Sequence, residues 1–178
     1  MPMGDGSLAD ILGILSVFLL VIVNGFFVAS EFSLVAVRRS RVAQLVAAGR
    51  MNARALQRAV AHLDYNLAAC QLGITIASLA LGWIGEPALA GLFEPLLAGS
   101  LGVFATFGAH AIAVATAFVI ITVLHIVLGE LAPKNLALQR SEATALLVVR
   151  PLMALGFIFK PAIVTRMEAG GQSLQRSR

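Results

Sequence analysis

The sequence predicts an all-α integral membrane protein with three transmembrane helices. Apolar residues make up 59% of the chain and charged residues only 12%, and the mean hydropathy is +0.91. This composition excludes an ordinary soluble domain. Three stretches without a charged residue are long enough for a helical crossing, which takes about 20 residues: residues 11–30, 65–85 and 95–129.

The first stretch is predicted to remain in the membrane and not to be a cleavable signal peptide. It is flanked by Asp5 and Asp10, and no basic residue precedes Arg38, whereas a signal peptide carries basic residues before its apolar core. The third stretch is too long for one crossing. We therefore expect an interfacial approach over residues 95–102, followed by a helix near 103–128.

The distribution of basic residues predicts the orientation of the spans. None of the 13 lies in 1–37 or 59–133; six lie in 38–58, which holds no acidic residue, and seven lie from Lys134 onward. Cytoplasmic loops carry an excess of Lys and Arg. We therefore expect residues 38–62 and the region after 130 to be cytoplasmic, with the N-terminus and the 85–102 connection outside. A basic segment between two spans favours lipid contact over nucleic-acid binding.

Two cytoplasmic juxtamembrane segments are expected, at 39–62 and 135–165. In the first, apolar residues recur at roughly helical spacing between arginines: Val42, Leu45, Val46, Ala53, Leu56, Val60 and Leu63. In the second, the apolar run 151–165 contains Gly156, Lys160 and Pro161, so we favour surface helices over a shallow hairpin. Residues 166–178 are polar and without pattern, and are expected to be a tail or truncated linker.

Glu130 is the strongest candidate for an ion ligand. It follows directly on the long uncharged run, and a carboxylate so close to hydrocarbon usually marks an ion or proton path. Pro133 has no N–H, so the carbonyl of Gly129, four residues back, lacks a helical partner. A carboxylate and a free carbonyl together favour hard cations such as Mg²⁺, Ca²⁺ and Na⁺.

The first span contains a second group of polar residues around the turn-forming dipeptide Asn24-Gly25. On an unbroken helix Asn24 and Ser33, nine residues apart, point to opposite sides. We therefore predict that the helix breaks near Gly25, so that Asn24, Ser30 and Ser33 converge on one ion and backbone carbonyls, such as that of Ala29, become free. In the alternative, the serines bond back to their own helix and Asn24 bonds a neighbouring helix.

Three further residues are considered as additional ion ligands: Glu31, Asn66 and Gly73. Glu31 either binds an ion or proton or pairs with Arg38 or another arginine. Small residues recur every four positions in the second span, at Ala69, Gly73 and Ala77, which favours close helix packing over ion contact by the Gly73 backbone or by Asn66.

The sequence contains no motif for enzymatic chemistry, so we expect no catalytic residue. The three histidines are scattered, Cys70 is the single cysteine, and neither a nucleophile–base pairing nor a phosphate loop is evident.

Three motifs resemble one known family. NGFFVASEFSLVAVRRSRV at 24–42, QLGITIASLALGWIGEPALA at 71–90 and GELAPKNLAL at 129–138 look like the DUF21-type transmembrane domain of the CNNM/CorC proteins, over about residues 8–165. The resemblance implies a transmembrane domain over residues 1–165, with three spans and a cytoplasmic helical belt. It also implies a homodimer in the bilayer of a bacterial inner membrane. The ATP-binding CBS modules of the full-length relatives are expected to be absent from this chain.

The resemblance also implies a function, Mg²⁺ transport, with Mg²⁺ exported as Na⁺ flows in. The family's ion-binding positions are occupied here by Asn24, Ser30, Ser33, Gly129 and Glu130. A second interpretation is a membrane anchor for CBS modules that senses Mg²⁺ without moving it, which predicts a bound ion and no flux. A pore-forming toxin is disfavoured, because uninterrupted apolar spans insert during synthesis.

Overall fold

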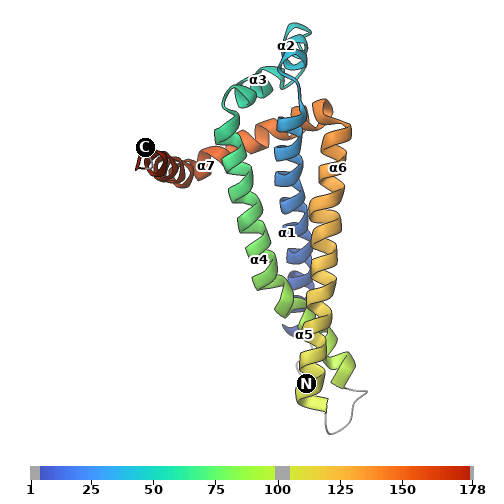
Figure 1. Cartoon of the computed structure of the whole chain (residues 1–178). Helices are drawn as coiled ribbons and strands as arrows, with labels where there is room; N and C mark the ends of the chain where they lie inside the picture. The colour runs from blue at the N-terminus through green and yellow to red at the C-terminus, as the bar shows by residue number, and fades with distance from the viewer. Residues whose placement is uncertain (1–4, 99–104, 177–178) are drawn as a thin grey trace. The chain divides into compact units, whose positions relative to one another are not determined.

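The computed structural model describes the backbone of residues 5–98 and 105–176, and the side chains of residues 11–91 and 111–158. The described residues form helices and no strand (Figure 1), which confirms the all-α class. In chain order these are α1 (Asp5–Ala36), α2 (Arg39–Ala47), α3 (Ala53–Ala61), α4 (Leu63–Ala98), α5 (Ala105–Leu124), the π-helix η2 (His125–Leu131), α6 (Ala132–Gln139) and α7 (Ser141–Arg176).

Four helical segments of the described chain are long and apolar enough to cross a membrane: Ile11–Ala36, Leu63–Gly91, Ala111–Gln139 and Ser141–Ile158. At most 33% of the most apolar window of each is buried inside the chain, so the remaining apolar surface needs lipid or another protein to cover it. The protein is therefore a multi-pass membrane protein. The first two segments contain the predicted spans 11–30 and 65–85, and the third overlaps the predicted helix near 103–128 from Ala111 onward. The count of three is not confirmed, because Ser141–Ile158 also qualifies.

The chain forms two compact units, and both α1 and α4 contribute to each. The first unit comprises Met1–Gly25 and Ile74–Ala132, and the second comprises Phe26–Gly73 and Pro133–Arg178. The apolar core of the first unit draws on α1, α4 and α5 and consists of Val17, Val21, Leu81, Leu89, Ala90, Ala117 and Ile121. A Cβ on Gly13 would lie only 2.7 Å from the Cβ of Ala88, so glycine permits the close approach of α1 and α4 there.

In the second unit the predicted surface helix over 39–62 is two helices, α2 and α3. Most of the expected apolar face is buried, namely Val42, Leu45, Ala53, Leu56 and Val60, while Val46 and Leu63 are half-buried. The break occurs at Gly49, whose φ of 65° is left-handed. The Gly49 N–H donates to the Val46 carbonyl, and the Arg50 N–H donates to the Leu45 carbonyl. These two bonds form the Schellman motif, which ends a helix at glycine.

The α7 helix forms the last part of the chain that the structure describes. It runs unbroken from Ser141 to Arg176, which agrees with the favoured helical interpretation of residues 135–165 and not with the alternative of a shallow hairpin. It also extends into residues 166–178, whose assignment as a tail or truncated linker stays a prediction. Three bonds attach it to earlier residues of the same unit: Arg41 Nε to Glu142 Oε1 at 2.8 Å, Asn52 Nδ2 to the Leu146 carbonyl at 2.8 Å and Tyr65 Oη to the Gly156 carbonyl at 2.6 Å.

The α4 helix is also longer than the predicted span. It continues past residue 85 to Ala98, so residues 95–98 of the expected interfacial approach belong to this helix. Residues 99–102 lie outside the described residues.

Candidate ion-binding site

The helix that carries Glu130 changes its hydrogen-bonding pattern at the predicted position. From His125 to Leu131 it is a π-helix, and the Ala132 N–H donates to the Val127 carbonyl five residues back. Pro133 explains the change, because a proline removes one N–H and its ring crowds the carbonyl four residues earlier, that of Gly129. Wide turns of this kind occur frequently at functional sites.

The Gly129 carbonyl has a partner on another helix of the first unit. Asn24 of α1 is fully buried, and its Nδ2 donates to Gly129 O at 3.0 Å. Glycine relieves a tight contact here, since a Cβ on Gly129 would lie 3.1 Å from Asn24 Nδ2. The Asn24 amide group therefore takes the position beside the carbonyl that the sequence analysis assigned to a cation.

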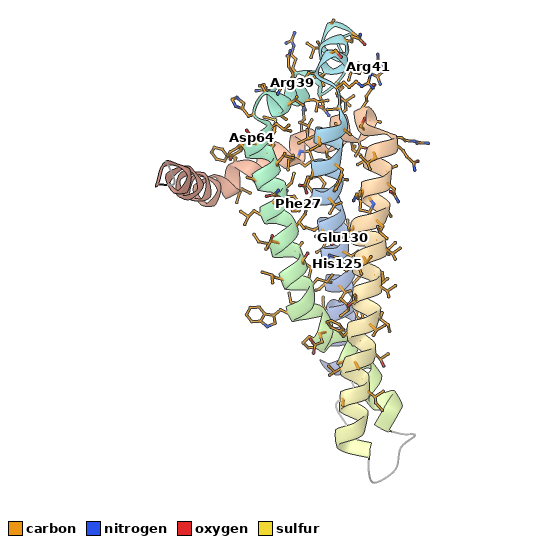
Figure 2. The ribbon with its side chains drawn as sticks, in the orientation of Figure 1. Phe27, Arg39, Arg41, Asp64, His125 and Glu130 are labelled. Atoms are coloured by element: carbon orange, nitrogen blue, oxygen red, sulfur yellow. The ribbon has the colours of Figure 1, made fainter. Side chains whose placement is uncertain are left out.

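Three more side chains join this polar cluster: Ser78 of α4, and His125 and Glu130 of η2. Ser78 Oγ donates to Asn24 Oδ1 at 3.3 Å. His125 Nε2 lies 3.2 Å from Glu130 Oε1, 3.3 Å from Asn24 Nδ2 and 3.5 Å from Ser78 Oγ. Figure 2 shows His125 and Glu130 close together along η2.

The orientation of the Asn24 amide is determined by its neighbours. The Gly129 carbonyl can only accept a hydrogen bond, so the NH₂ group must face it, and Oδ1 is left to accept from Ser78. His125 Nε2 carries either a proton or a lone pair. It can therefore donate to Glu130 or accept from Asn24, but not both. His125 Nε2 is thus the atom at which the cluster can change its hydrogen bonds without a change in the backbone.

The cluster opens into a groove of about 370 Å³ within the first unit. Two carboxylates, Glu86 and Glu130, line this groove together with the side chains of Ser78, Thr122 and His125. The Glu130 side chain is 50% exposed and that of His125 is 18% exposed, while Asn24 is fully buried. Other residues of the chain therefore cover the carboxylate only in part, whereas they cover the amide completely.

The predicted break in the first span is wrong. α1 is an unbroken helix from Asp5 to Ala36, through Asn24 and Gly25. The predicted break was needed to aim both Asn24 and Ser33 at one ion. Without it, side chains nine residues apart point to opposite faces of the helix. Ala29 also lies inside the helix, where a carbonyl is normally bonded to the N–H four residues on.

Ser30 and Ser33 belong to the second unit and are bonded within their own helix. Ser30 Oγ donates to the Phe26 carbonyl at 2.7 Å, and Ser33 Oγ donates to the Ser30 carbonyl at 3.2 Å. Together with the bond from Asn24 to Gly129, these contacts match the alternative in which the serines bond back to α1 and Asn24 bonds a neighbouring helix. The role of Ser30 and Ser33 as ion ligands stays a prediction.

The three additional candidates also belong to the second unit. Asn66 is buried, and its Nδ2 donates to the carbonyls of Ala59 and His62 at 3.0 and 2.9 Å, which links α4 to the end of α3. Gly73 faces Phe27, whose ring atoms would lie 2.5 Å from a Cβ at that position. Glu31 is half-buried and forms no ion pair with an arginine in the described part of the chain.

His125 and Ser78 were not among the predicted site residues. A spacing of five residues from His125 to Glu130 does not place both side chains on one face of an α-helix. In a π-turn the spacing does align them, because its hydrogen bonds join residues five apart. Ser78 directly follows Ala77, the last of the small residues that recur every four positions in the second span. Across the described residues, no three His, Cys, Asp or Glu side chains come together, so a metal ion here would depend mainly on neutral oxygens.

Comparison with known proteins identifies relatives of this chain. Residues 14–171 match the family described as the cyclin M transmembrane N-terminal domain, CNNM. The chain is 41% identical over 143 residues to UPF0053 protein YugS of Bacillus subtilis (strain 168), an alignment that covers 80% of this chain and 33% of YugS. It is 43% identical over 149 residues to UPF0053 protein YhdP of the same organism, covering 81% of this chain and 32% of YhdP.

A more distant relative is the uncharacterized protein Rv1841c of Mycobacterium tuberculosis (strain ATCC 25618 / H37Rv). It is 38% identical over 150 residues, covering 84% of this chain and 42% of Rv1841c. The chain therefore spans about a third of the length of YugS and YhdP and somewhat more of Rv1841c.

Proposed function

The chain belongs to the cyclin M transmembrane-domain family and is similar to UPF0053 proteins, and we propose that it carries Mg²⁺ across the cell membrane. The proposed direction is export, coupled to an inflow of Na⁺. The observation that supports this proposal is the polar cluster in which Asn24 bonds the Gly129 carbonyl beside Glu130. Polar and ionisable groups inside membrane segments are costly and usually functional.

The cluster offers the type of ligand that Mg²⁺ prefers. Mg²⁺ binds oxygen atoms in near-octahedral geometry and usually retains water molecules. Four groups of the cluster carry oxygen: the Asn24 amide, the Ser78 hydroxyl, the Gly129 carbonyl and the Glu130 carboxylate. The single negative charge leaves a divalent ion only partly neutralised, so the ion can be released again.

The polar cluster is closed by its own hydrogen bonds. For Asn24 to bind a cation, its amide must rotate so that Oδ1 faces the ion and Nδ2 leaves the Gly129 carbonyl. The cation then replaces the NH₂ group as the partner of that carbonyl. Substrate binding therefore competes with an internal hydrogen bond worth about 0.5–1.5 kcal/mol, which favours transport over very tight binding.

Glu130 is the proposed exchange point for the two ions. It is the charged ligand of the cluster and lines the open groove, so Mg²⁺ and Na⁺ would bind the same carboxylate in turn. The resemblance also implies Ser30 and Ser33 as ligands, and alanine variants at both positions test that part of the proposal. The functional unit is proposed to be a homodimer, with the N-terminus outside and the C-terminus in the cytoplasm.

Flux measurement in proteoliposomes tests the proposal. Wild-type protein should release internal Mg²⁺ when a Na⁺ gradient is applied, and Glu130→Gln should abolish both the flux and Mg²⁺ binding measured by calorimetry, because an amide cannot balance a divalent charge in low dielectric. The matched control is Asp64→Asn, which removes one exposed carboxylate outside the cluster and should leave the flux unchanged. Mg²⁺ binding by wild type without any flux would instead identify a sensing anchor.

A further inference from the structure

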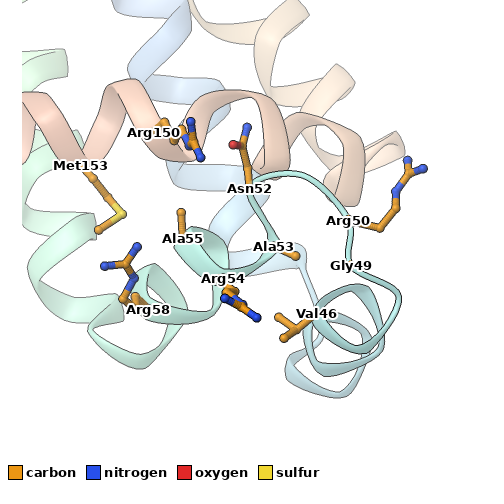
Figure 3. A pocket seen from close by; sticks show the side chains of 10 residues that line it. All are labelled: Val46, Gly49, Arg50, Asn52, Ala53, Arg54, Ala55, Arg58, Arg150 and Met153. Atoms are coloured by element: carbon orange, nitrogen blue, oxygen red, sulfur yellow. The ribbon is translucent and has the colours of Figure 1, made fainter.

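A second site is indicated by a basic groove in the second unit. The groove has a volume of about 630 Å³ and is formed by the end of α2, the turn that follows it, α3 and α7. This volume is in the usual range for a small-molecule site, roughly 300–1,000 Å³. Figure 3 shows the groove with four arginines among its lining residues: Arg50, Arg54, Arg58 and Arg150.

The four arginines have no counter-charge in the described part of the chain. All four are exposed, and none forms an ion pair with a carboxylate there. The sequence from Arg38 to Leu63 contains no acidic residue, and the nearby Glu142 is already bonded to Arg41. Arg54 and Arg58 are four residues apart on α3, a spacing at which like charges destabilise a helix. The groove is therefore electrostatically unfavourable when it is empty.

The start of α3 adds further donors to the same groove. Asn52, which precedes α3, has a left-handed φ of 65° and makes no side-chain cap bond. Its Nδ2 instead donates to the Leu146 carbonyl, and its Oδ1 is buried without a hydrogen-bond partner. The first turn of α3 holds no acidic residue, and Ala53, Arg54 and Ala55 line the groove. The Ala53 N–H already donates to the Arg50 carbonyl at 3.1 Å, which leaves the N–H groups of Arg54 and Ala55 in the first turn to attract an anion.

The groove also lies at the boundary of the membrane. α2 begins three residues after α1 ends, and α4 begins two residues after α3 ends. The α2–α3 segment therefore joins two candidate spans on one side of the bilayer. Phosphate groups are concentrated at that level, in the headgroups of anionic lipids.

We propose that this groove binds a phosphate group, held by Arg54, Arg58 and Arg150 and by the first turn of α3. Arginine suits this ligand because its planar guanidinium group forms paired hydrogen bonds with phosphate oxygens. Both an anionic phospholipid and soluble phosphate present this chemistry. The site does not depend on the proposed Mg²⁺ transport.

The test compares two double variants that remove the same charge. Arg54→Gln/Arg58→Gln removes two groove arginines, and Arg39→Gln/Arg140→Gln removes two exposed arginines outside the groove. Each protein is placed in phosphatidylcholine nanodiscs with and without phosphatidylglycerol, and the retained phosphatidylglycerol is measured by native mass spectrometry. We expect about tenfold weaker retention in the groove variant than in the control variant, as for the loss of a charge-assisted hydrogen bond.

A second arm identifies the source of the phosphate. Inorganic phosphate and glycerol phosphate are titrated into protein in phosphatidylcholine nanodiscs, and the melting temperature is recorded. The site binds soluble phosphate if added phosphate raises the melting temperature of wild type but not of the groove variant, and if both double variants retain phosphatidylglycerol equally. The site binds the lipid headgroup if the groove variant retains less phosphatidylglycerol than the control variant and added phosphate does not raise the melting temperature of wild type. Equal behaviour of the two double variants in both arms would overturn the proposal.

The variant Arg54→Glu provides an independent check. A carboxylate in the first turn of α3 stabilises the start of the helix. The introduced side chain then takes the place of an anionic ligand at the N–H groups of that turn. We expect a higher melting temperature without ligand and no response to phosphate or phosphatidylglycerol. A response equal to that of wild type would contradict the proposed role of this helix end.

Discussion

Gly129 combines two functions in one residue, because its carbonyl accepts from Asn24 and its missing side chain makes room for that amide. A Cβ at this position would lie 3.1 Å from Asn24 Nδ2, closer than the ordinary van der Waals contact. Gly129→Ala should therefore displace the amide and leave buried polar groups unpaired, at a cost of about 1–3 kcal/mol. We expect Mg²⁺ flux in proteoliposomes to fall on the order of tenfold.

The control for this variant is Gly91→Ala. A Cβ on Gly91 would meet no atom within 4 Å, and the residue lies outside the polar cluster. Its flux should equal that of wild type. Wild-type flux in Gly129→Ala would show that the bond between Asn24 and Gly129 is not part of the transport cycle.

Gly73 gives a residue-scale prediction about packing in the second unit. The ring of Phe27 is buried, and its atoms would lie 2.5 Å from an added Cβ, so Gly73→Ala should destabilise the protein by about 1–3 kcal/mol. On the same helix Gly82 has open space around it, and Gly82→Ala should stabilise α4 by about 0.5–1 kcal/mol. Thermal unfolding in detergent measures both changes.

The double variant Gly73→Ala/Phe27→Leu separates packing from ion binding at this position. If Gly73 is required only for the approach of Phe27, the smaller side chain restores part of the lost stability, and the two changes are not additive. A melting temperature of Gly73→Ala equal to that of wild type would contradict the packing role.

At the scale of the helix, Pro133 determines where the π-turn forms. Pro133→Ala supplies an N–H that can donate to the Gly129 carbonyl, in competition with the Asn24 amide. Removing a proline from continuous helix should raise stability by up to about 3 kcal/mol. The same change should lower Mg²⁺ flux, because Gly129 O would be engaged within its own helix. Melting temperature and flux are measured on one preparation, and a rise or no change in flux would refute this role of the π-turn.

The helices themselves were largely predictable from the sequence, because apolar content and helical spacing depend on local residues. Gly129 could also be identified, since the effect of Pro133 acts four residues away in the same helix. The partner of its carbonyl could not, because the bond to Asn24 joins residues 105 positions apart. His125 was missed for a related reason, since only the π-turn aligns it with Glu130.

The wrong prediction at Asn24-Gly25 has a physical explanation in the surroundings of α1. In water this dipeptide favours a turn, because solvent can bond the amide groups that a broken helix releases. Inside a membrane no water is available, and each unpaired group costs several kcal/mol. α1 therefore remains helical, and only the side chain of Asn24 finds a partner outside it. The Gly49 break lies in a surface segment, where the ordinary glycine rule applies.

At the scale of the whole molecule, the number of crossings depends on α7. Its segment Ser141–Ile158 could span a membrane by length and composition. However, Glu142, Leu146 and Gly156 are bonded to Arg41, Asn52 and Tyr65. Arg41 and Asn52 lie in the segment that joins α1 to α4, and Tyr65 lies in the first turn of α4. About 21 Å of α7, at 1.5 Å per residue, is thus attached to chain that connects two spans on one side of the bilayer.

We therefore predict three crossings, with α7 along the same membrane surface as α2 and α3. A reporter fused to the C-terminus should lie on the same side as a thiol label at Met51→Cys, and on the side opposite a label at Gly91→Cys. Both cysteines are placed in a Cys70→Ala background. Met51 is 80% exposed and avoids the strained left-handed backbone of Gly49, and Gly91 has open space around it. Impermeant reagent applied to intact cells should react at Gly91→Cys only. With four crossings the reporter would instead appear on the side of Gly91, because one additional crossing reverses the location of the C-terminus relative to Met51.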